Sequence, residues 1–149
     1  MIQFSMLLVN NNRSKAYLQN LLSNNFIPNK IILLNDSNVT LAEHTENDKI
    51  ISTKTNQKFI RRLKNIDIEF DEKEHVFTTI SKNNIEVIHL NSLNVNDNIV
   101  VDAVKKLNDT YIVYSGPGGT ILKKEILNQN KKFIHVHPGE LPKYRGSTT

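Results

Sequence analysis

The 149-residue chain contains no cysteine, no tryptophan, five glycines and four prolines. The absence of cysteine excludes disulfide bonds, thiolate metal sites and cysteine nucleophiles. No apolar run approaches the length of a membrane span. The apolar start, MIQFSMLLV, lacks the basic leader and small-residue cleavage site of a secretory signal. These absences predict a soluble, cytoplasmic protein without a membrane partner.

The net charge is mildly basic, at +4 for the whole chain at pH 7. The basic residues are spread along the chain and do not form a stripe interleaved with aromatic side chains, which a nucleic-acid surface would need. Solvated surface charge and an anionic small substrate are both compatible with this pattern. Nucleic acid, tRNA included, is therefore not the expected partner.

Short apolar runs alternate with segments of helical periodicity. The pattern predicts strands at 6–9, 30–34, 86–90, 110–114 and 133–136, and helices at 14–23, 71–82, 97–107 and 120–127. Residues 36–70 fit neither pattern clearly. Alternating strands and helices are typical of βαβ units. We therefore expect residues 1–149 to form one α/β domain, with a mostly parallel, Rossmann-like sheet flanked by helices.

All five glycines fall in two loops that follow predicted strands. Gly116, Gly118 and Gly119 belong to SGPGGTIL, whereas Gly139 and Gly146 belong to HVHPGELPKYRG. Ligands of a doubly wound sheet bind beyond the carboxyl ends of its strands, where both loops would lie. Glycine lets a backbone approach a flat ligand, although a plain strand-to-helix connection explains the first loop equally well. That loop matches neither GxGxxG nor a Gly-Lys-Ser/Thr motif, so phosphate binding is not expected.

Two histidines stand at the end of the last predicted strand. His135 and His137 are two positions apart, so their side chains would share one face. If that face opens onto a cleft, both imidazoles could reach one reacting centre; a surface or structural pair is the alternative. A metal pair would need further ligands at recognisable spacing, which the sequence lacks, so no metal is expected. His44, His75 and His89 are expected to be structural.

The segments DTYIVYSGPGGTILKKEIL and FIHVHPGELPKYRGSTT resemble the folate-dependent formyltransferases. That family includes methionyl-tRNA formyltransferase, glycinamide ribonucleotide formyltransferase and the sugar N-formyltransferases. Its signature is a strand ending in Asn-x-His, a small pair of residues, Leu-Pro, and Arg-Gly a few residues later. The resemblance implies that the catalytic residues are His137 and His135. It also implies that the folate is bound by Gly116, Pro117, Gly118, Gly119, Leu141 and Pro142. The implied substrate-binding residues are Arg145 and Gly146.

The resemblance also implies a mechanism, in which an amine attacks the formyl carbon of the co-substrate 10-formyltetrahydrofolate. His137 would move the proton or, as imidazolium, stabilise the oxyanion. His135 replaces the family's asparagine and could donate a hydrogen bond when protonated or in a suitable tautomer. The family's catalytic aspartate lies a few dozen residues beyond the histidine, whereas this sequence stops at Thr149. We therefore expect a fragment or truncated protein that alone does not turn over at a normal enzymatic rate.

The formyl acceptor is left open by these motifs. The opening LLVNNNRSKAYLQNLL differs from the methionyl-tRNA subfamily, so a small amine, such as a nucleotide-linked amino sugar, is the expected acceptor. A non-catalytic Rossmann-like binding module is one alternative, favoured by His135 and the missing aspartate. A formyltetrahydrofolate hydrolase, with water as the acceptor, is another.

Overall fold

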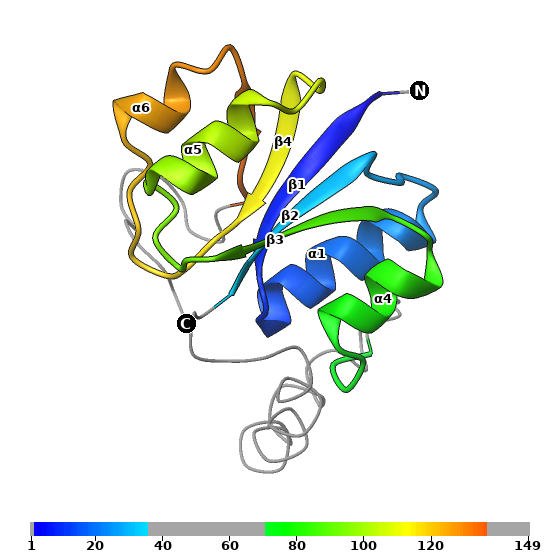
Figure 1. Ribbon diagram of the computed structural model, residues 1–149. Helices are drawn as coiled ribbons and strands as arrows, with labels where there is room; N and C mark the ends of the chain where they lie inside the picture. Colours follow the sequence, from blue (N-terminus) through cyan, green and yellow to red (C-terminus); the bar gives the residue numbers. More distant parts are fainter. Residues whose placement is uncertain (1, 36–70, 137–149) are drawn as a thin grey trace, which may run out of the picture.

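The structure, a computed structural model, describes residues 2–35 and 71–136. In chain order its elements are β1 (Phe4–Val9), α1 (Asn12–Ser23), β2 (Lys30–Asn35), α4 (Val76–Lys82), β3 (Glu86–Asn91), α5 (Asn98–Lys105), β4 (Tyr111–Ser115), α6 (Lys124–Leu127) and β5 (Lys132–Ile134). The strands form a five-stranded, all-parallel sheet in the order β3-β2-β1-β4-β5, with helices on both faces (Figure 1). The predicted Rossmann-like α/β fold is confirmed.

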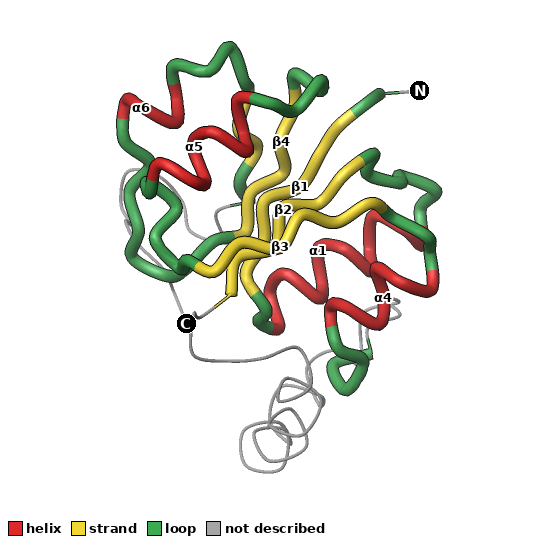
Figure 2. Tube along the Cα trace, viewed as in Figure 1, coloured by secondary structure: helices red, strands yellow, loops and turns green. Residues whose placement is uncertain are grey.

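The strand β1 lies in the middle of the sheet, between β2 and β4. Leu7 of β1 pairs with Ile32 on one side and with Tyr114 on the other. The chain runs outward from β1 through β2 to β3, then crosses to the opposite side of β1 and forms β4 and β5 (Figure 2). The strand order thus reverses between β1 and β4. The carboxyl ends of these two strands are where sheets of this type bind ligands.

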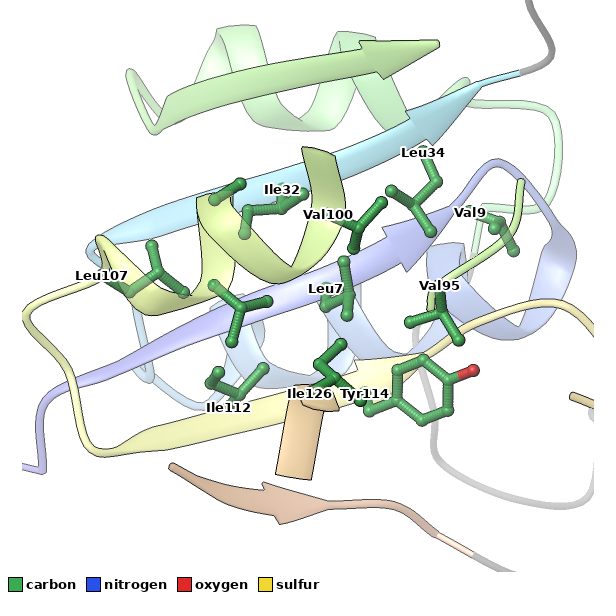
Figure 3. Close-up of a cluster of buried hydrophobic side chains, with 12 residues drawn as sticks. Leu7, Val9, Ile32, Leu34, Val95, Val100, Leu107, Ile112, Tyr114 and Ile126 are labelled. Carbon is green, nitrogen blue, oxygen red and sulfur yellow. The ribbon is translucent and has the colours of Figure 1, made fainter. Parts of the chain in front are cut away.

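The central strands carry apolar side chains on both faces and so contribute to two hydrophobic cores. Met6 and Leu8 of β1 belong to the core beneath α1 and α4. Leu7 and Val9 belong to the core beneath α5 and α6 (Figure 3). Every residue of β1 is buried. Burial of each such Leu side chain stabilises the fold by about 1.5–3 kcal/mol, so the packing holds β1 firmly in place.

The helix predicted at 71–82 begins later, at Val76. The carboxylate of Asp71 accepts hydrogen bonds from the backbone N–H groups of Lys73 and Glu74, at 2.9 and 3.3 Å. These bonds form a turn before the helix, because a short acidic side chain competes for nearby backbone donors. The helix then starts after His75, whose Nδ1 accepts from the N–H of Phe77 at 3.0 Å. The prediction was therefore wrong at this boundary.

The helix predicted at 120–127 is also shorter, covering only Lys124–Leu127. The side-chain amide of Asn96 donates to the carbonyl oxygen of Ile121 at 3.0 Å and accepts from the N–H of Lys123 at 2.8 Å. Two backbone groups in the expected first turn are therefore bonded to a residue from another part of the chain. The other predicted strands and helices agree with the observed ones to within two residues at each end.

A polar network closes the amino end of the sheet around Asp109, which is buried. Its carboxylate accepts a hydrogen bond from the hydroxyl of Ser5 at 2.6 Å and another from the side-chain amide of Asn29 at 2.8 Å. The ammonium group of Lys131 donates to the backbone carbonyl of Asp109 at 2.9 Å. These contacts join the starts of the four neighbouring strands β2, β1, β4 and β5, so this end of the sheet has a structural role.

Candidate functional site

The carboxyl ends of β1 and β4 are joined through the first turn of α1. Asn11 caps this helix, because its side-chain oxygen accepts a hydrogen bond from the N–H of Ser14 at 2.8 Å. The hydroxyl of Ser14 lies 2.9 Å from the hydroxyl of Ser115 and 3.1 Å from the Ser115 carbonyl oxygen. Both serines are fully buried. The start of α1 is thereby fixed against the end of β4.

Arg13 holds the glycine-containing loop that follows β4. Its Nε donates to the hydroxyl of Ser115 at 3.1 Å, and its Nη2 donates to the carbonyl oxygen of Gly116. The guanidinium therefore brings a permanent positive charge to this edge of the sheet. The sequence analysis did not identify Arg13 or Ser14 as site residues. The signal that could have identified them is their position soon after Val9, where the central strand ends.

Gly116 packs against the aromatic ring of Tyr114. A Cβ atom at position 116 would lie 2.1 Å from the Tyr114 hydroxyl oxygen and 2.3 Å from the adjoining ring carbon, so any side chain would clash. Gly118 and Gly119 differ, because no atom of residues 2–35 and 71–136 lies within 4 Å of a Cβ position at either residue. Gly119 has a φ of 72°, which favours glycine. The loop therefore needs glycine at two positions, for two different reasons.

The hydroxyl of Tyr114 is buried and has no hydrogen-bond partner within the described part of the chain. Figure 3 shows it pointing away from the core, in the direction in which β1 runs. Burial raises the pKa of Tyr114, and the Arg13 guanidinium acts in the opposite direction. A neutral phenol is thus held at the carboxyl edge of the sheet.

His135 follows β5, which ends at Ile134, so the strand predicted at 133–136 stops two residues early. The Nδ1 atom of His135 lies 3.0 Å from the carbonyl oxygen of Tyr114. The two rings are tilted by 53°, with centroids 5.7 Å apart. The side chain of His135 is exposed. It therefore lies against Tyr114, near the end of β4, and outside the strand in which the sequence analysis placed it.

The segment after β5 is also held from α1. The hydroxyl of Tyr17 donates a hydrogen bond to the carbonyl oxygen of Val136 at 3.0 Å. Burial raises the pKa of Tyr17, whereas the positive charge of Arg13 lowers it. Two neighbouring elements, α1 and β4, thus position the residues that lead directly into His137.

Several predicted site residues lie outside the described residues: His137, Leu141, Pro142, Arg145 and Gly146. The shared site of His135 and His137 therefore stays a prediction, as do the roles of the Leu-Pro and Arg-Gly pairs. His44 also lies outside the described part. Among the predicted residues, the structure brings His135 and Gly116 together through their common neighbour, Tyr114.

His75 has the structural role that was expected of it. Its Nδ1 accepts the hydrogen bond that caps α4, so its Nε2 carries the hydrogen. Nε2 lies 2.8 Å from the amide nitrogen of Asn10, which cannot accept this hydrogen. Exchanging the oxygen and nitrogen of this amide would give the Nε2 hydrogen an acceptor, and would give a partner to the buried Asn10 oxygen, which has none within the described residues.

A surface hollow of about 480 Å³ lies between α1 and α4 and is lined by Gln19, Asp71 and Glu74, among others. The side-chain amide of Gln19 pairs with the backbone of Asp71 in both directions, at 2.8 and 2.9 Å. The carboxylate of Glu74 bonds with Lys82 and Thr79. These polar groups already have partners, and none of them belongs to the site at the ends of β1 and β4.

Within residues 2–35 and 71–136, no group of three His, Asp or Glu side chains is arranged to hold a metal ion. None of the helices in these two ranges has the length and apolar character needed to cross a membrane.

Part of the chain is similar to a known enzyme. No family model matches the chain. Over 56 residues the chain is 45% identical to a methionyl-tRNA formyltransferase from Finegoldia magna. This chain is a partial homologue of a formyltransferase. The match covers 37% of the chain and 18% of that enzyme, so the chain corresponds to a small part of the curated relative. The all-parallel sheet is consistent with the N-terminal domain of a formyltransferase.

Proposed function

We propose that the protein transfers a formyl group from 10-formyltetrahydrofolate to an amine. The partial homology to a formyltransferase is the observation that carries this proposal. The geometry at the carboxyl ends of β1 and β4 supports it, because the exposed imidazole of His135 and the first glycine of the loop, Gly116, both contact Tyr114 there.

The loop after β4 is the proposed wall of the folate pocket. Gly116, Pro117, Gly118 and Gly119 would present backbone N–H and C=O groups to the flat pterin ring, together with the side chains of Leu141 and Pro142. Arg13 keeps the start of this loop in place through its bonds to Ser115 and Gly116. A loop that is already ordered before binding loses less conformational entropy when the ligand arrives.

The proposed reaction needs stabilisation of a negative charge and movement of one proton. Attack of the amine on the formyl carbon gives a tetrahedral oxyanion, and the proton on the attacking nitrogen must reach the leaving nitrogen of the folate. His137 would contribute proton transfer or oxyanion stabilisation, and His135 would contact the same reacting centre. Arg145 and Gly146 would hold the acceptor.

A small amine, such as an amino sugar attached to a nucleotide, is the proposed acceptor. The positive charge of Arg13 and the net charge of +4 suit an anionic substrate of this class. Methionyl-tRNA is a second candidate, which the similarity to the Finegoldia magna enzyme favours.

The test supplies 10-formyltetrahydrofolate with a nucleotide-linked amino sugar, with methionyl-tRNA or with water alone, and measures release of tetrahydrofolate. The 149-residue chain and the full gene product are compared. Transfer to either amine supports the proposal and identifies the acceptor. Release in water alone would make the protein a hydrolase, and folate binding without turnover in the full gene product would make it a binding module.

The histidines are tested in the form of the protein that is active. His137→Ala should lower kcat by about 10² or more, as the loss of a general acid–base does. Folate affinity should change little, because the pocket wall is assigned to the loop at 116–119. His135→Asn should lower kcat by a smaller factor than His137→Ala does. The reverse order of the two variants would show that the principal catalytic histidine is His135.

A further inference from the structure

The hydrogen bond between His135 and Tyr114 determines which ring nitrogen carries the hydrogen. Nδ1 of His135 lies 3.0 Å from the backbone carbonyl oxygen of Tyr114. A carbonyl oxygen can only accept a hydrogen bond, so Nδ1 must be the donor. In the neutral imidazole the remaining nitrogen, Nε2, then carries a lone pair and no hydrogen.

The Tyr114 carbonyl oxygen lies just beyond the last residue pair of β4 and β5. The N–H of Lys132 donates to the carbonyl oxygen of Thr110 at 2.8 Å, so alternate carbonyls of this stretch, at Thr110, Ile112 and Tyr114, face β5. The strand β5 ends at Ile134, and Tyr114 is buried. The imidazole of His135 supplies a donor just past the end of the strand, where the ladder stops. Loss of this tautomer would remove that donor from a backbone acceptor in a buried residue.

We propose that His135 is a catalytic residue that accepts a proton from the attacking amine through Nε2, a role opposite to donation to the oxyanion. This inference rests on the proposed formyl transfer. It requires the attacking amine of the acceptor substrate to carry an N–H group that points at His135 during attack. A neutral ring held in this tautomer has no hydrogen at Nε2 and cannot donate from that atom.

The proposed step conserves atoms and charge. The amine nitrogen forms a bond to the formyl carbon, and the carbonyl π electrons move to oxygen. The positively charged nitrogen then gives one proton to Nε2 of His135. When the oxyanion re-forms the carbonyl, the bond from carbon to the folate nitrogen breaks, and that nitrogen takes the proton back from His135. The products are a formamide and tetrahydrofolate, with His135 neutral again.

The tautomer is tested without ligand or turnover. Long-range ¹H–¹⁵N correlation spectra of the 149-residue chain at pH 8 distinguish a hydrogen-bearing ring nitrogen from one with a lone pair. The His135 signals are assigned by their loss in His135→Asn. We expect hydrogen on Nδ1 and a lone pair on Nε2. Hydrogen on Nε2, in either the neutral or the charged ring, overturns the inference.

The proton-accepting role is tested by His135→Phe, which keeps a flat ring and removes both nitrogens. We expect kcat to fall by about 10² in the active form, with the dissociation constant for tetrahydrofolate unchanged. His135→Asn, whose amide oxygen can accept a hydrogen bond, should recover part of the loss. Equal rates for wild type and His135→Phe overturn the role. Absence of transfer by the wild type refutes the proposed function and the catalytic role together, whereas the spectra decide the tautomer in either case.

Discussion

The backbone of Gly116 lies directly against the ring of Tyr114, leaving no space for a side chain at position 116. The ring belongs to the core beneath α5 and α6, and Gly116 is the first residue of the candidate folate-binding loop. The contact between Gly116 and the Tyr114 ring therefore belongs both to the packing of this core and to the start of the loop.

Gly116→Ala should lower the free energy of unfolding by about 1–3 kcal/mol, the usual cost of forcing an extra carbon atom into a packed site. Urea unfolding measures this change. Gly118→Ala is the matched control, because its Cβ would meet nothing within 4 Å. Gly119→Ala should fall between them, at about 1 kcal/mol, since its φ of 72° strains an alanine. A larger loss for Gly118→Ala than for Gly116→Ala would contradict the packing explanation.

Tyr114→Phe should leave the free energy of unfolding unchanged or raise it by up to about 1 kcal/mol, because hydrogen replaces a buried hydroxyl that has no partner among the described residues. Tyr17→Phe is the comparison, since it removes the bond to the Val136 carbonyl oxygen. We expect it to cost about 0.5 kcal/mol. Thermal unfolding of both variants checks the prediction, and a greater loss for Tyr114→Phe would show that its hydroxyl has a partner.

Asp109→Ala should destabilise the fold by about 3 kcal/mol, because Ser5 and Asn29 would lose a buried charged acceptor. Asp102, exposed on α5, provides the control. Asp102→Ala should change the stability by no more than about 0.5 kcal/mol. Similar losses in the two variants would mean that the network at the amino end of the sheet contributes little.

The contribution of Glu74 to stability should depend on pH. The hydrogen bond from Lys82 lowers the pKa of Glu74 below 4.5, against the effect of burial, and Thr79 adds a second bond. Because the folded-state pKa is below the unfolded value, the stabilisation is present above pH 4.5 and is lost as the pH falls through the folded-state pKa. Glu74→Gln should therefore cost up to about 1 kcal/mol at pH 6 and less at pH 3.

Urea unfolding at the two pH values measures the Glu74 effect, and Lys82→Met tests its cause. In the Lys82→Met background, Glu74→Gln should have a smaller effect at pH 6, because the principal partner is gone. An undiminished effect in that background would assign the stabilisation to another group.

The parallel sheet was predictable from the sequence because its central strands are buried on both faces. The run Ile31–Leu34 is therefore continuously apolar, and the predicted start of β2 at Lys30 was correct. The starts of α4 and α6 were not predictable in this way. The turn at Asp71 and the contact from Asn96 to Ile121 depend on individual polar side chains, which hydrophobic periodicity does not register.

The candidate site was partly predictable for a similar reason. The motif around His135 lies in one continuous stretch, so its resemblance to the formyltransferases was visible in the sequence. Arg13 and Ser14 reach Ser115 from more than a hundred positions away, and no local pattern reports such contacts. Topology could have suggested them, because a reversal of strand order brings the residues after two distant strands together.

The long sequence separation between Ser14 and Ser115 has a consequence for how the site forms and how it is lost. No short segment of the chain contains both sides of the site, so it cannot persist in a locally folded fragment. Backbone amide hydrogens at 115–116 should therefore exchange with solvent only when the whole sheet opens. A ligand bound there would stabilise that sheet as a unit, by about 2.7 kcal/mol at one hundred times its dissociation constant. Occupancy of one edge would then protect even β3, on the far side of the sheet, from proteolysis.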